Sequence, residues 1–469
     1  MRHFGIEYFV PTKYFLKGVF TMKTRKILAL LLAVLMVVGC LAACGGNGDT
    51  NTTTAAGQDS TGAGTTLTTE PWSAEQIAQM GEAIKAEANG QTVTLKVWGP
   101  DAAQDVLKSQ TAAFAELFKD YAQFEIAVAV QGENDAASAV LNDAKTAADV
   151  FGFPSDQIDK LYPAGVIAPV LFSDEVTATN TAASVAAASK EGTLYGYPET
   201  GDNSYILVYD KSVVSDEQAK SFETLIDACK AAGKYFIMDA KNGFFSCMFI
   251  YTGGLKTMGF EADGETQAFN DYNIDQVTAS VKAFAELFKA AGTTFVSSDT
   301  SAVPDGFKNG TTAAGIAGSW NIAAVKEALG ENAGFAIIPT ININGTATQT
   351  INMFGYKFLG VNSQSKFPGT SQVLAYYLTN YDCQMERAEK LEWAPSNIEA
   401  QSSDFVKGNP SMAALMAQTE FSVPQTGLAG TFWDPLAALG SYMCDSASDL
   451  SDTALKAEVE ACISNIRDE

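Results

Sequence analysis

The stretch Val93-Thr94-Leu95-Lys96-Val97-Trp98-Gly99-Pro100-Asp101 decides the class of the fold. Val93, Leu95 and Val97 alternate with polar residues, which predicts a half-buried strand that runs into a loop. Apolar residues at helical spacing follow, and then a second period-two run, a helical stretch over about 135–147 and an apolar run over 149–153. This order predicts a β-α-β-α-β unit, and therefore an α/β protein whose parallel sheet is covered by helices.

The same pattern returns further along the chain. We expect helices over 222–232 and 322–329, each stopped by a glycine, and an apolar helical stripe that ends at Gly292. Short strands are expected over 235–238, 314–317 and 335–338, and mostly helix over 395–469. A chain of 469 residues with 47% hydrophobic content can build two sizeable cores, so two lobes are the first expectation.

Charge and histidine content exclude several classes of function. The formal net charge is −24, which repels polyanions, so nucleic acid is not expected as a partner. His3 is the sole histidine, and it lies upstream of a predicted leader. Its loss on processing would exclude Ser-His-Asp and Cys-His catalysis and the H-E-x-x-H zinc motif. We therefore expect no cofactor and no metal, and an enzyme would have to use carboxylates or lysine.

The amino-terminal region predicts export. Lys23, Arg25 and Lys26 precede a short apolar run, and Leu41-Ala42-Ala43-Cys44 resembles the bacterial lipobox. We expect residues 1–43 to be an upstream segment and lipoprotein signal peptide, of which 1–21 resemble an over-extended start. Lipid on Cys44 would anchor the protein outside the cytoplasm, on the cell membrane, through a flexible tether over 44–70. The five later cysteines show no metal pattern, and single buried thiols are expected, with one disulfide left open.

Several segments, taken in order, resemble the maltose/maltodextrin-binding family of extracellular solute-binding proteins, from about Thr92 to Arg467. They are Leu95–Asp101, Asp149–Asp156, Gly192–Pro198, Tyr205–Lys211, Ser221–Ile226, Phe307–Ala313, Gly318–Trp320, Ile338–Thr340, Gly360–Asn362, Ala394–Asn397 and Thr431–Trp433. Each motif is weak by itself, and the resemblance rests on their joint order.

The resemblance implies a periplasmic-binding-protein-like fold with two α/β lobes, a hinge and a ligand cleft between the lobes. It places the first lobe at 71–204 and 340–393 and the second at 205–339 and 394–469, with crossings near Glu199 to Ser204, Thr340 and Ala394. The implied function is capture of a carbohydrate for an ABC importer permease, by a protein that we expect to be a monomer.

A neutral sugar offers apolar C–H faces and a rim of hydroxyls, which match aromatic faces and carboxylates or amides. By matched position we expect Trp320 and Trp433 as stacking platforms, with Phe244 and Phe151 as further aromatic candidates that could equally be core residues. The expected polar contacts are Asp101, Asp156, Glu199, Asp202, Asn203 and Asn321. The loop Pro198–Ser204 is one residue longer than the family pattern, which leaves the register of its acids open.

Two alternatives stay open. The same fold could bind a cationic solute such as a polyamine, because acids and aromatic rings also suit that ligand. A glycoside hydrolase that uses two carboxylates is the other, although no catalytic motif surrounds any acidic pair. An anionic ligand would need Arg or Lys in the cleft, and the matched segments supply mainly acids, amides and aromatic rings, which favours a neutral or cationic ligand.

Overall fold

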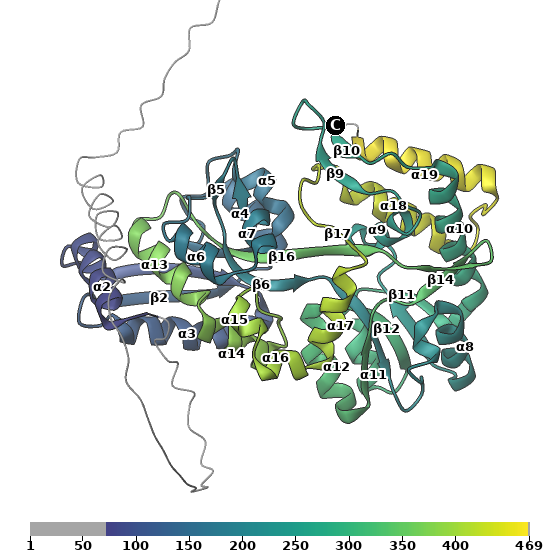
Figure 1. Cartoon of the computed structure of the whole chain (residues 1–469), viewed down its shortest axis with the longest axis horizontal. Coiled ribbons are helices and arrows are strands. Elements are labelled where there is room, and N and C mark those ends of the chain that lie inside the picture. Colours follow the sequence, from purple (N-terminus) through teal and green to yellow (C-terminus); the bar gives the residue numbers. More distant parts are fainter. Residues whose placement is uncertain (1–71, 468–469) are drawn as a thin grey trace, which may run out of the picture.

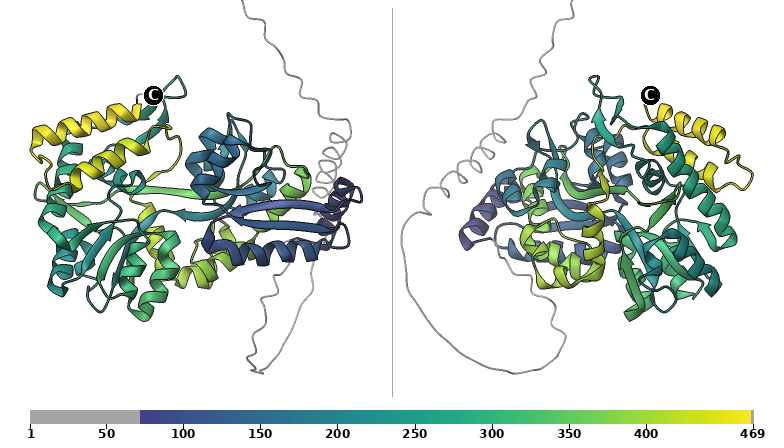
Figure 2. Two further views of the ribbon diagram at one scale, coloured as in Figure 1. Left: turned by 180° about the vertical axis from the view of Figure 1, so that it is seen from behind. Right: turned by 45° about the vertical axis from the view of Figure 1, so that its right-hand side comes forward.

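The structure is a computed structural model, and it describes residues 72–467. The predicted leader, the tether and Cys44 lie outside the described residues. The chain forms two α/β lobes that lie side by side and are joined by extended segments, as Figure 1 shows and as the two views of Figure 2 confirm. This is the periplasmic-binding-protein-like architecture that the sequence predicts.

The first lobe is built on a sheet with the strand order β17-β16-β3-β1-β2, in which β6 also pairs with β16. Its strands are β1 (Val93–Gly99), β2 (Phe124–Val130), β3 (Val150–Pro154), β6 (Tyr197–Asn203), β16 (Asn352–Val361) and β17 (Ser422–Pro424), with a hairpin of β4 (Ser189–Lys190) and β5 (Thr193–Leu194). Its helices are α2 (Ala74–Ala88), α3 (Gln104–Leu117), α4 (Glu133–Asn142), α5 (Ile158–Leu161), α6 (Ser173–Thr179), α7 (Ala182–Ala187), α13 (Pro368–Leu378) and α14 (Tyr381–Leu391).

The predicted β-α-β-α-β unit is present in this lobe. The strands β2 and β3 both run parallel to β1, as the unit requires. The sheet as a whole is mixed, because β16 enters antiparallel to β3 and β6. Helix α4 begins and ends earlier than the predicted 135–147.

The second lobe is built on a sheet with the order β11-β8-β12-β7-β13. Its strands are β7 (Tyr205–Asp210), β8 (Tyr235–Met238), β11 (Phe295–Ser297), β12 (Thr312–Gly318) and β13 (Ala333–Ala336), with hairpins of β9 (Thr257–Phe260) and β10 (Gln267–Phe269) and of β14 (Thr340–Ile343) and β15 (Thr346–Gln349). Its helices are α8 (Phe222–Ala232), α9 (Gly243–Tyr251), α10 (Ile274–Ala291), α11 (Ala302–Lys308), α12 (Ile322–Leu329), α17 (Pro410–Thr419), α18 (Trp433–Cys444) and α19 (Asp452–Arg467), and the short α15 (Ile398–Gln401) and α16 (Asp404–Gly408) lie before α17.

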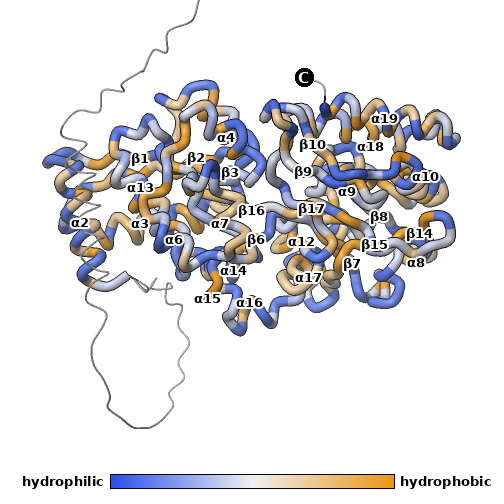
Figure 3. Tube along the Cα trace, turned by 45° about the horizontal axis from the view of Figure 1, so that its top comes forward, coloured by the Kyte–Doolittle hydropathy of each residue, from blue (hydrophilic) through white to orange (hydrophobic). Residues whose placement is uncertain are grey.

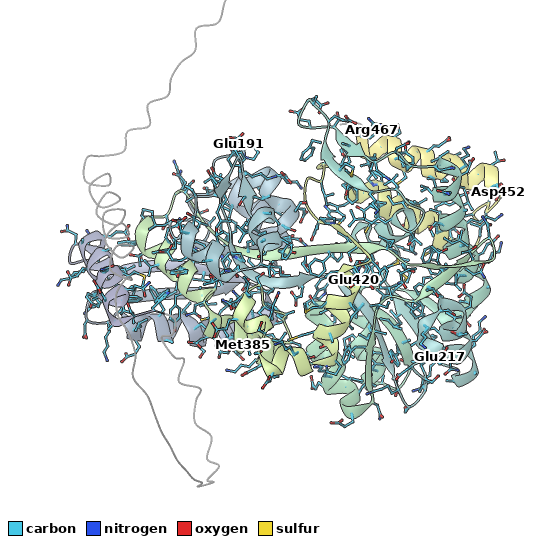
Figure 4. The ribbon with its side chains drawn as sticks, viewed as in Figure 1. Glu191, Glu217, Met385, Glu420, Asp452 and Arg467 are labelled. Atoms are coloured by element: carbon cyan, nitrogen blue, oxygen red, sulfur yellow. The ribbon has the colours of Figure 1, made fainter. Side chains whose placement is uncertain are left out.

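Each lobe has its own hydrophobic core. Strand β7 shows why the sheet of the second lobe is covered on both sides: Tyr205 and Leu207 belong to one core cluster, whereas Ile206 and Val208 belong to another on the opposite face. Figure 3 shows the apolar stretches along the strands and inner helices of both lobes. The outer helix α19 is held near its ends, where Lys282 Nζ lies 2.6 Å from Asp452 Oδ1 and Arg467 Nη2 lies 3.2 Å from Glu261 Oε1 (Figure 4).

The chain passes between the lobes along β6–β7 and along β16. Strand β16 contributes Met353 to the core of the second lobe and Phe358 to the core of the first. The two passages are tied at Ser204, whose Oγ donates to the Met353 carbonyl at 2.9 Å and accepts from Asn352 Nδ2 at 3.0 Å. These contacts hold the two passages together where the chain leaves one core for the other.

The structure moves two of the expected lobe boundaries. Residues 340–349 form the β14–β15 hairpin, which packs on α8 and α10 of the second lobe, so the return to the first lobe is made by β16 and not near Thr340. Strand β17 pairs with β16 and extends the first sheet, although it lies within the segment 394–469 that was expected in the second lobe.

All five cysteines between residues 72 and 467 are free, and Cys444 is the one of these that is not fully buried. Over the same residues, no helix combines the length and the apolar character that crossing a bilayer would require.

Candidate functional site

A cavity of about 500 Å³ lies between the two lobes, at the ends of the strands of the first lobe. The first lobe lines it with the loop after β1, the start of α4 and the turn after β3, and the second lobe lines it with Asn242, Phe244, Trp320 and Trp433. The interlobe segments supply Asn203, Lys357, Trp393 and Gln425. Its volume falls in the range of small-molecule sites in proteins.

The second lobe presents a cluster of aromatic rings to this cavity. The centroid of the Phe244 ring lies 6.0 Å from that of Trp320 and 6.1 Å from that of Trp433. Phe244 and Trp433 are near the starts of helices α9 and α18, and Trp320 follows β12 in a short 3₁₀ turn. These elements are anchored in the core behind them, so the rings are held in place before a ligand arrives.

Gly243 allows the two helices that carry these rings to approach. A Cβ at Gly243 would lie 2.4 Å from the carbonyl oxygen of Trp433 and 2.9 Å from its Cα. No side chain can be accommodated at such distances without movement of the backbone. The sequence therefore places a glycine where the first turns of α9 and α18 touch.

The first lobe supplies polar groups opposite the rings. Asp156 accepts from Gln157 Nε2 at 2.7 Å and from Gln425 Nε2 at 3.0 Å, and Gln425 Oε1 accepts from Asn203 Nδ2 at 2.6 Å. Burial raises the pKa of Asp156 to about 7, because desolvation outweighs the hydrogen bond from Gln157. This carboxyl group is therefore partly protonated near neutral pH.

Lys357 lies at the floor of the cavity, at the middle of β16. Its Nζ is 2.8 Å from Glu133 Oε2, and it lies 5.6 Å from the ring centroid of Trp320 and 4.9 Å from that of Trp393. Burial opposes the charge of Lys357, but the Coulombic attraction of Glu133, Asp202 and Glu199 outweighs it and raises the pKa of the amine. The cavity therefore contains a fixed positive charge that is paired with a carboxylate.

Of the residues expected to contact a ligand, five line the cavity: Asp156, Asn203, Phe244, Trp320 and Trp433. Asp101 is exposed in the turn Asp101–Ala103, and its neighbours Pro100 and Ala102 line the cavity in its place. Asn321 is buried behind Trp320, and its Oδ1 has no hydrogen-bond partner among residues 72–467.

Phe151 requires a correction. Its side chain is fully buried in the core of the first lobe, with its ring centroid 5.8 Å from that of Phe153. Every residue of β3 is buried because β1 and β16 flank this strand on its two edges and the helices of the lobe cover its faces. A large apolar side chain here fills the core and is not available to a ligand.

Glu199 and Asp202 are buried in the hinge and do not line the cavity. Glu199 Oε1 lies 3.1 Å from Arg387 Nε, and Asp202 Oδ2 accepts from the backbone N–H of Ala394 at 2.7 Å. Burial raises the pKa of Glu199 and raises that of Asp202 to about 6. Two register shifts in the pairing of β6 with β16 accommodate extra residues between Pro198 and Asn203. Asp202 faces the segment that follows α14, where it meets Ala394.

Sequence reasoning missed several residues of the cavity, above all Lys357, Trp393 and Glu133. Glu133 follows the end of β2, and the carboxyl ends of parallel strands are where ligands bind in open α/β sheets, so its position could have been used. Trp393 directly precedes the recognised segment Ala394–Asn397. Lys357 gave the weakest signal, because a lysine flanked by aromatic residues in a strand normally points to solvent. The matched segments, which supply mainly acids, amides and aromatic rings, gave no indication of this lysine.

Comparisons with known proteins place the chain among solute-binding proteins. A structure solved with acarbose shares 27% identity, with a TM-score of 0.72, over 80% of this chain and 99% of that chain. A maltodextrin-binding protein from L. casei BL23 without ligand shares 21% identity, with a TM-score of 0.68, over 81% of this chain and 100% of that one. The maltotriose-binding protein of Thermus thermophilus, bound with maltotriose, shares 18% identity, with a TM-score of 0.66, over 80% of this chain and 99% of that one.

The two likenesses at 21% and 18% identity show the fold alone. Among curated proteins, none matches the chain. The sequence pattern of the family described as bacterial extracellular solute-binding protein matches residues 109–414, which is more than half of the chain. With two lobes and a cavity between them, the chain belongs to the bacterial extracellular solute-binding protein family.

Proposed function

We propose that the protein binds a neutral oligosaccharide between its lobes and delivers it, chemically unchanged, to the permease of an ABC importer. The observation that carries this proposal is the pairing of an aromatic wall with a polar wall. Phe244, Trp320 and Trp433 stand on one side of the cavity, and Asp156, Asn203 and Gln157 stand on the other. Aromatic faces suit the C–H surface of a sugar ring, and carboxylate and amide groups suit its hydroxyls.

The contact free energies expected in this cavity are large enough for micromolar binding of a sugar. Each ring that packs against a sugar face contributes about 0.5–1.5 kcal/mol beyond area burial, and each hydrogen bond to an ionised group contributes about 1.5–3 kcal/mol. A few contacts of each kind reach about −8 kcal/mol, which corresponds to micromolar binding. The neighbour solved with acarbose, at 27% identity, supports a saccharide ligand.

Closure of the lobes is the mechanism that we propose for capture. The aromatic wall belongs to the second lobe, whereas Asp156 and Gln157 of the polar wall belong to the first, so a ligand contacts both walls fully only when the lobes are close together. A ligand shifts the hinge equilibrium by the difference in its contact free energy between the two states. Small-angle scattering with and without ligand measures this change.

Calorimetry with maltotriose, against amino acids and polyamines as a panel, tests the ligand class. We expect heat from saccharides only, together with a change in tryptophan emission and a thermal shift. A ligand at 100 times its dissociation constant adds about 2.7 kcal/mol to stability. Product analysis after long incubation tests the claim that no bond is broken, and released shorter sugars would favour the hydrolase alternative.

Two variants separate the aromatic contacts from folding. Trp320→Ala and Trp433→Ala remove rings that line the cavity and are only partly buried, so we expect each to weaken saccharide binding at least several-fold. The melting temperature of the ligand-free protein should change little for Trp320→Ala. A large loss of stability without a loss of affinity in the remaining folded protein would assign that ring to the core.

Anchoring by lipid on Cys44 is a separate part of the proposal, because it rests on the sequence alone. Cys44→Ser should release the protein from the membrane fraction into the medium. Continued association after a high-salt wash would contradict lipid anchoring. The soluble variant should bind saccharides as the anchored protein does, since residue 44 lies far in sequence from every residue of the cavity.

A further inference from the structure

The floor of the cavity contains an arrangement that the proposed saccharide ligand does not explain. The side chain of Lys357 is only 5% exposed, yet it lines the cavity, with its Nζ 2.8 Å from Glu133 Oε2. The same nitrogen faces the indole rings of Trp320 and Trp393. Glu133 belongs to the first lobe, Trp320 to the second, and Lys357 to the strand that joins them.

A carboxylate with two aromatic faces is the chemistry by which proteins bind ammonium ligands. The negative faces of the rings attract the cation, and the carboxylate neutralises it. The acids that act on Lys357 come from different elements, namely Glu133 on α4 and Asp202 and Glu199 on β6. Arg387 on α14 forms an ion pair with Glu199 and not with Glu133.

We propose that Lys357 is an internal cation that occupies the ammonium site of the cavity and thereby makes the protein reject cationic solutes. The part of this inference that concerns neutral ligands rests on the proposed function, because it places a polyhydroxylated ligand next to the lysine. The part that concerns the rejection of cationic solutes rests on the contacts of Lys357 alone.

The pair of Lys357 and Glu133 also selects for a hydroxyl group. Glu133 Oε1 has no hydrogen-bond partner among the described residues, although it is buried. An ammonium group can donate three hydrogen bonds, and the contact with Glu133 accounts for one. A hydroxyl can donate to Glu133 and accept from Lys357. An ammonium ligand can only donate and a carboxylate can only accept, so each would meet one group of its own charge.

Removal of the lysine side chain provides a direct test. Lys357→Ala deletes the atoms from Cγ to Nζ, which correspond to n-propylammonium. We expect this variant to bind n-propylammonium chloride, seen as a thermal shift and in calorimetry, at least tenfold more tightly than propan-1-ol, which has the same size without the charge. Wild-type protein should bind neither compound in the cavity. Adding Glu133→Gln to Lys357→Ala should abolish the preference for the cation.

Equal binding of n-propylammonium by wild-type protein and Lys357→Ala would overturn the inference, as would equal binding of the cation and the alcohol by the variant. Lys357→Met, which keeps most of the bulk, covers the case in which Lys357→Ala does not fold. We expect Lys357→Met to bind spermidine at least tenfold more tightly than wild-type protein does, and maltotriose about fivefold less tightly. No gain for spermidine would count against an internal cation.

The control is a lysine–indole contact outside the cavity. Lys96 Nζ lies 6.0 Å from the ring centroid of Trp98, and neither residue lines the cavity. Lys96→Met should leave both affinities unchanged. If wild-type protein binds no saccharide at all, the proposed function fails, whereas the n-propylammonium experiment still decides whether Lys357 fills a cation site.

Discussion

Asn203 Nδ2 donates a 2.6 Å hydrogen bond to Gln425 Oε1, and this contact joins the first interlobe strand to the segment that follows β17. The same Gln425 side chain donates from Nε2 to Asp156 at 3.0 Å. One amide group therefore connects a polar residue of the cavity wall to the hinge. The side chains of all three residues are largely buried, although they line the cavity.

Gln425→Ala should lower both stability and affinity. It leaves Asp156 and Asn203 each with one fewer partner in a buried setting, which costs about 1–3 kcal/mol of unfolding free energy. Urea unfolding and calorimetry with maltotriose measure the two effects. Gln401→Ala is the control, because Gln401 donates to the Pro395 carbonyl away from the cavity and should change stability slightly and affinity not at all. Unchanged affinity in Gln425→Ala would mean that the bridge does not position Asp156.

Arg387 and Glu199 should show strong energetic coupling. The Arg387 side chain is 1% exposed, its Nε is 3.1 Å from Glu199 Oε1, and its Nη1 donates to the Leu378 carbonyl at 2.6 Å. Arg387→Met leaves Glu199 as an unpaired buried acid, which costs about 3–5 kcal/mol. Adding Glu199→Gln removes that charge and should recover part of the loss. A double-mutant cycle by urea unfolding measures the coupling, and strictly additive losses would contradict it.

Asp156 should make the protein less stable as the pH rises toward neutrality. Its pKa is about 7 in the folded state and about 4 in an unfolded chain, so the folded state holds this proton more tightly. The stabilising contribution of protonated Asp156 is therefore fully present below pH 4 and is lost as the pH rises to about 7. The free energy of unfolding falls by up to about 1.4 kcal/mol per pH unit because of this group. The difference in unfolding free energy between Asp156→Asn and wild-type protein should grow in favour of the variant over this range.

The control for this pH dependence is an acid with the opposite shift. The hydrogen bonds from Thr266 and the backbone lower the pKa of the exposed Asp263 to about 2. Since this group is ionised in both states above pH 5, the effect of Asp263→Asn on stability should not vary between pH 5 and pH 7.5. A flat difference for Asp156→Asn over the same range would show that its carboxyl group titrates normally.

Local signals in the sequence placed elements accurately where a cap fixes the boundary. Helices α8 and α12 begin and end where predicted, because Gly233 and Gly330 stop them with positive φ angles. Strand β13 ends two residues before the expected end at Ile338, since no local signal marks where its pairing with β7 stops. The order of motifs identified the two lobes.

Contacts between distant segments were harder to predict. Trp320 and Trp433 lie in recognisable motifs, but whether Glu199 faces the cavity depends on the pairing of β6 with β16, which is set by residues far apart in sequence. The same pairing turns Lys357 inward. The side chains of a strand alternate between its two faces, but the sequence of the strand alone does not indicate which face will line a cavity between lobes.

Gly243 should control the position of the aromatic wall. Its place against the Trp433 backbone leaves no room for a Cβ, so Gly243→Ala must push α18 away from α9. Because Trp433 and Phe244 lie at the starts of these helices, both rings should shift. We expect affinity for maltotriose to fall at least tenfold, with a lower melting temperature. Gly408→Ala is the matched control, since no atom lies within 4 Å of its added Cβ. Wild-type affinity in Gly243→Ala would show that the ligand does not depend on how α9 and α18 meet.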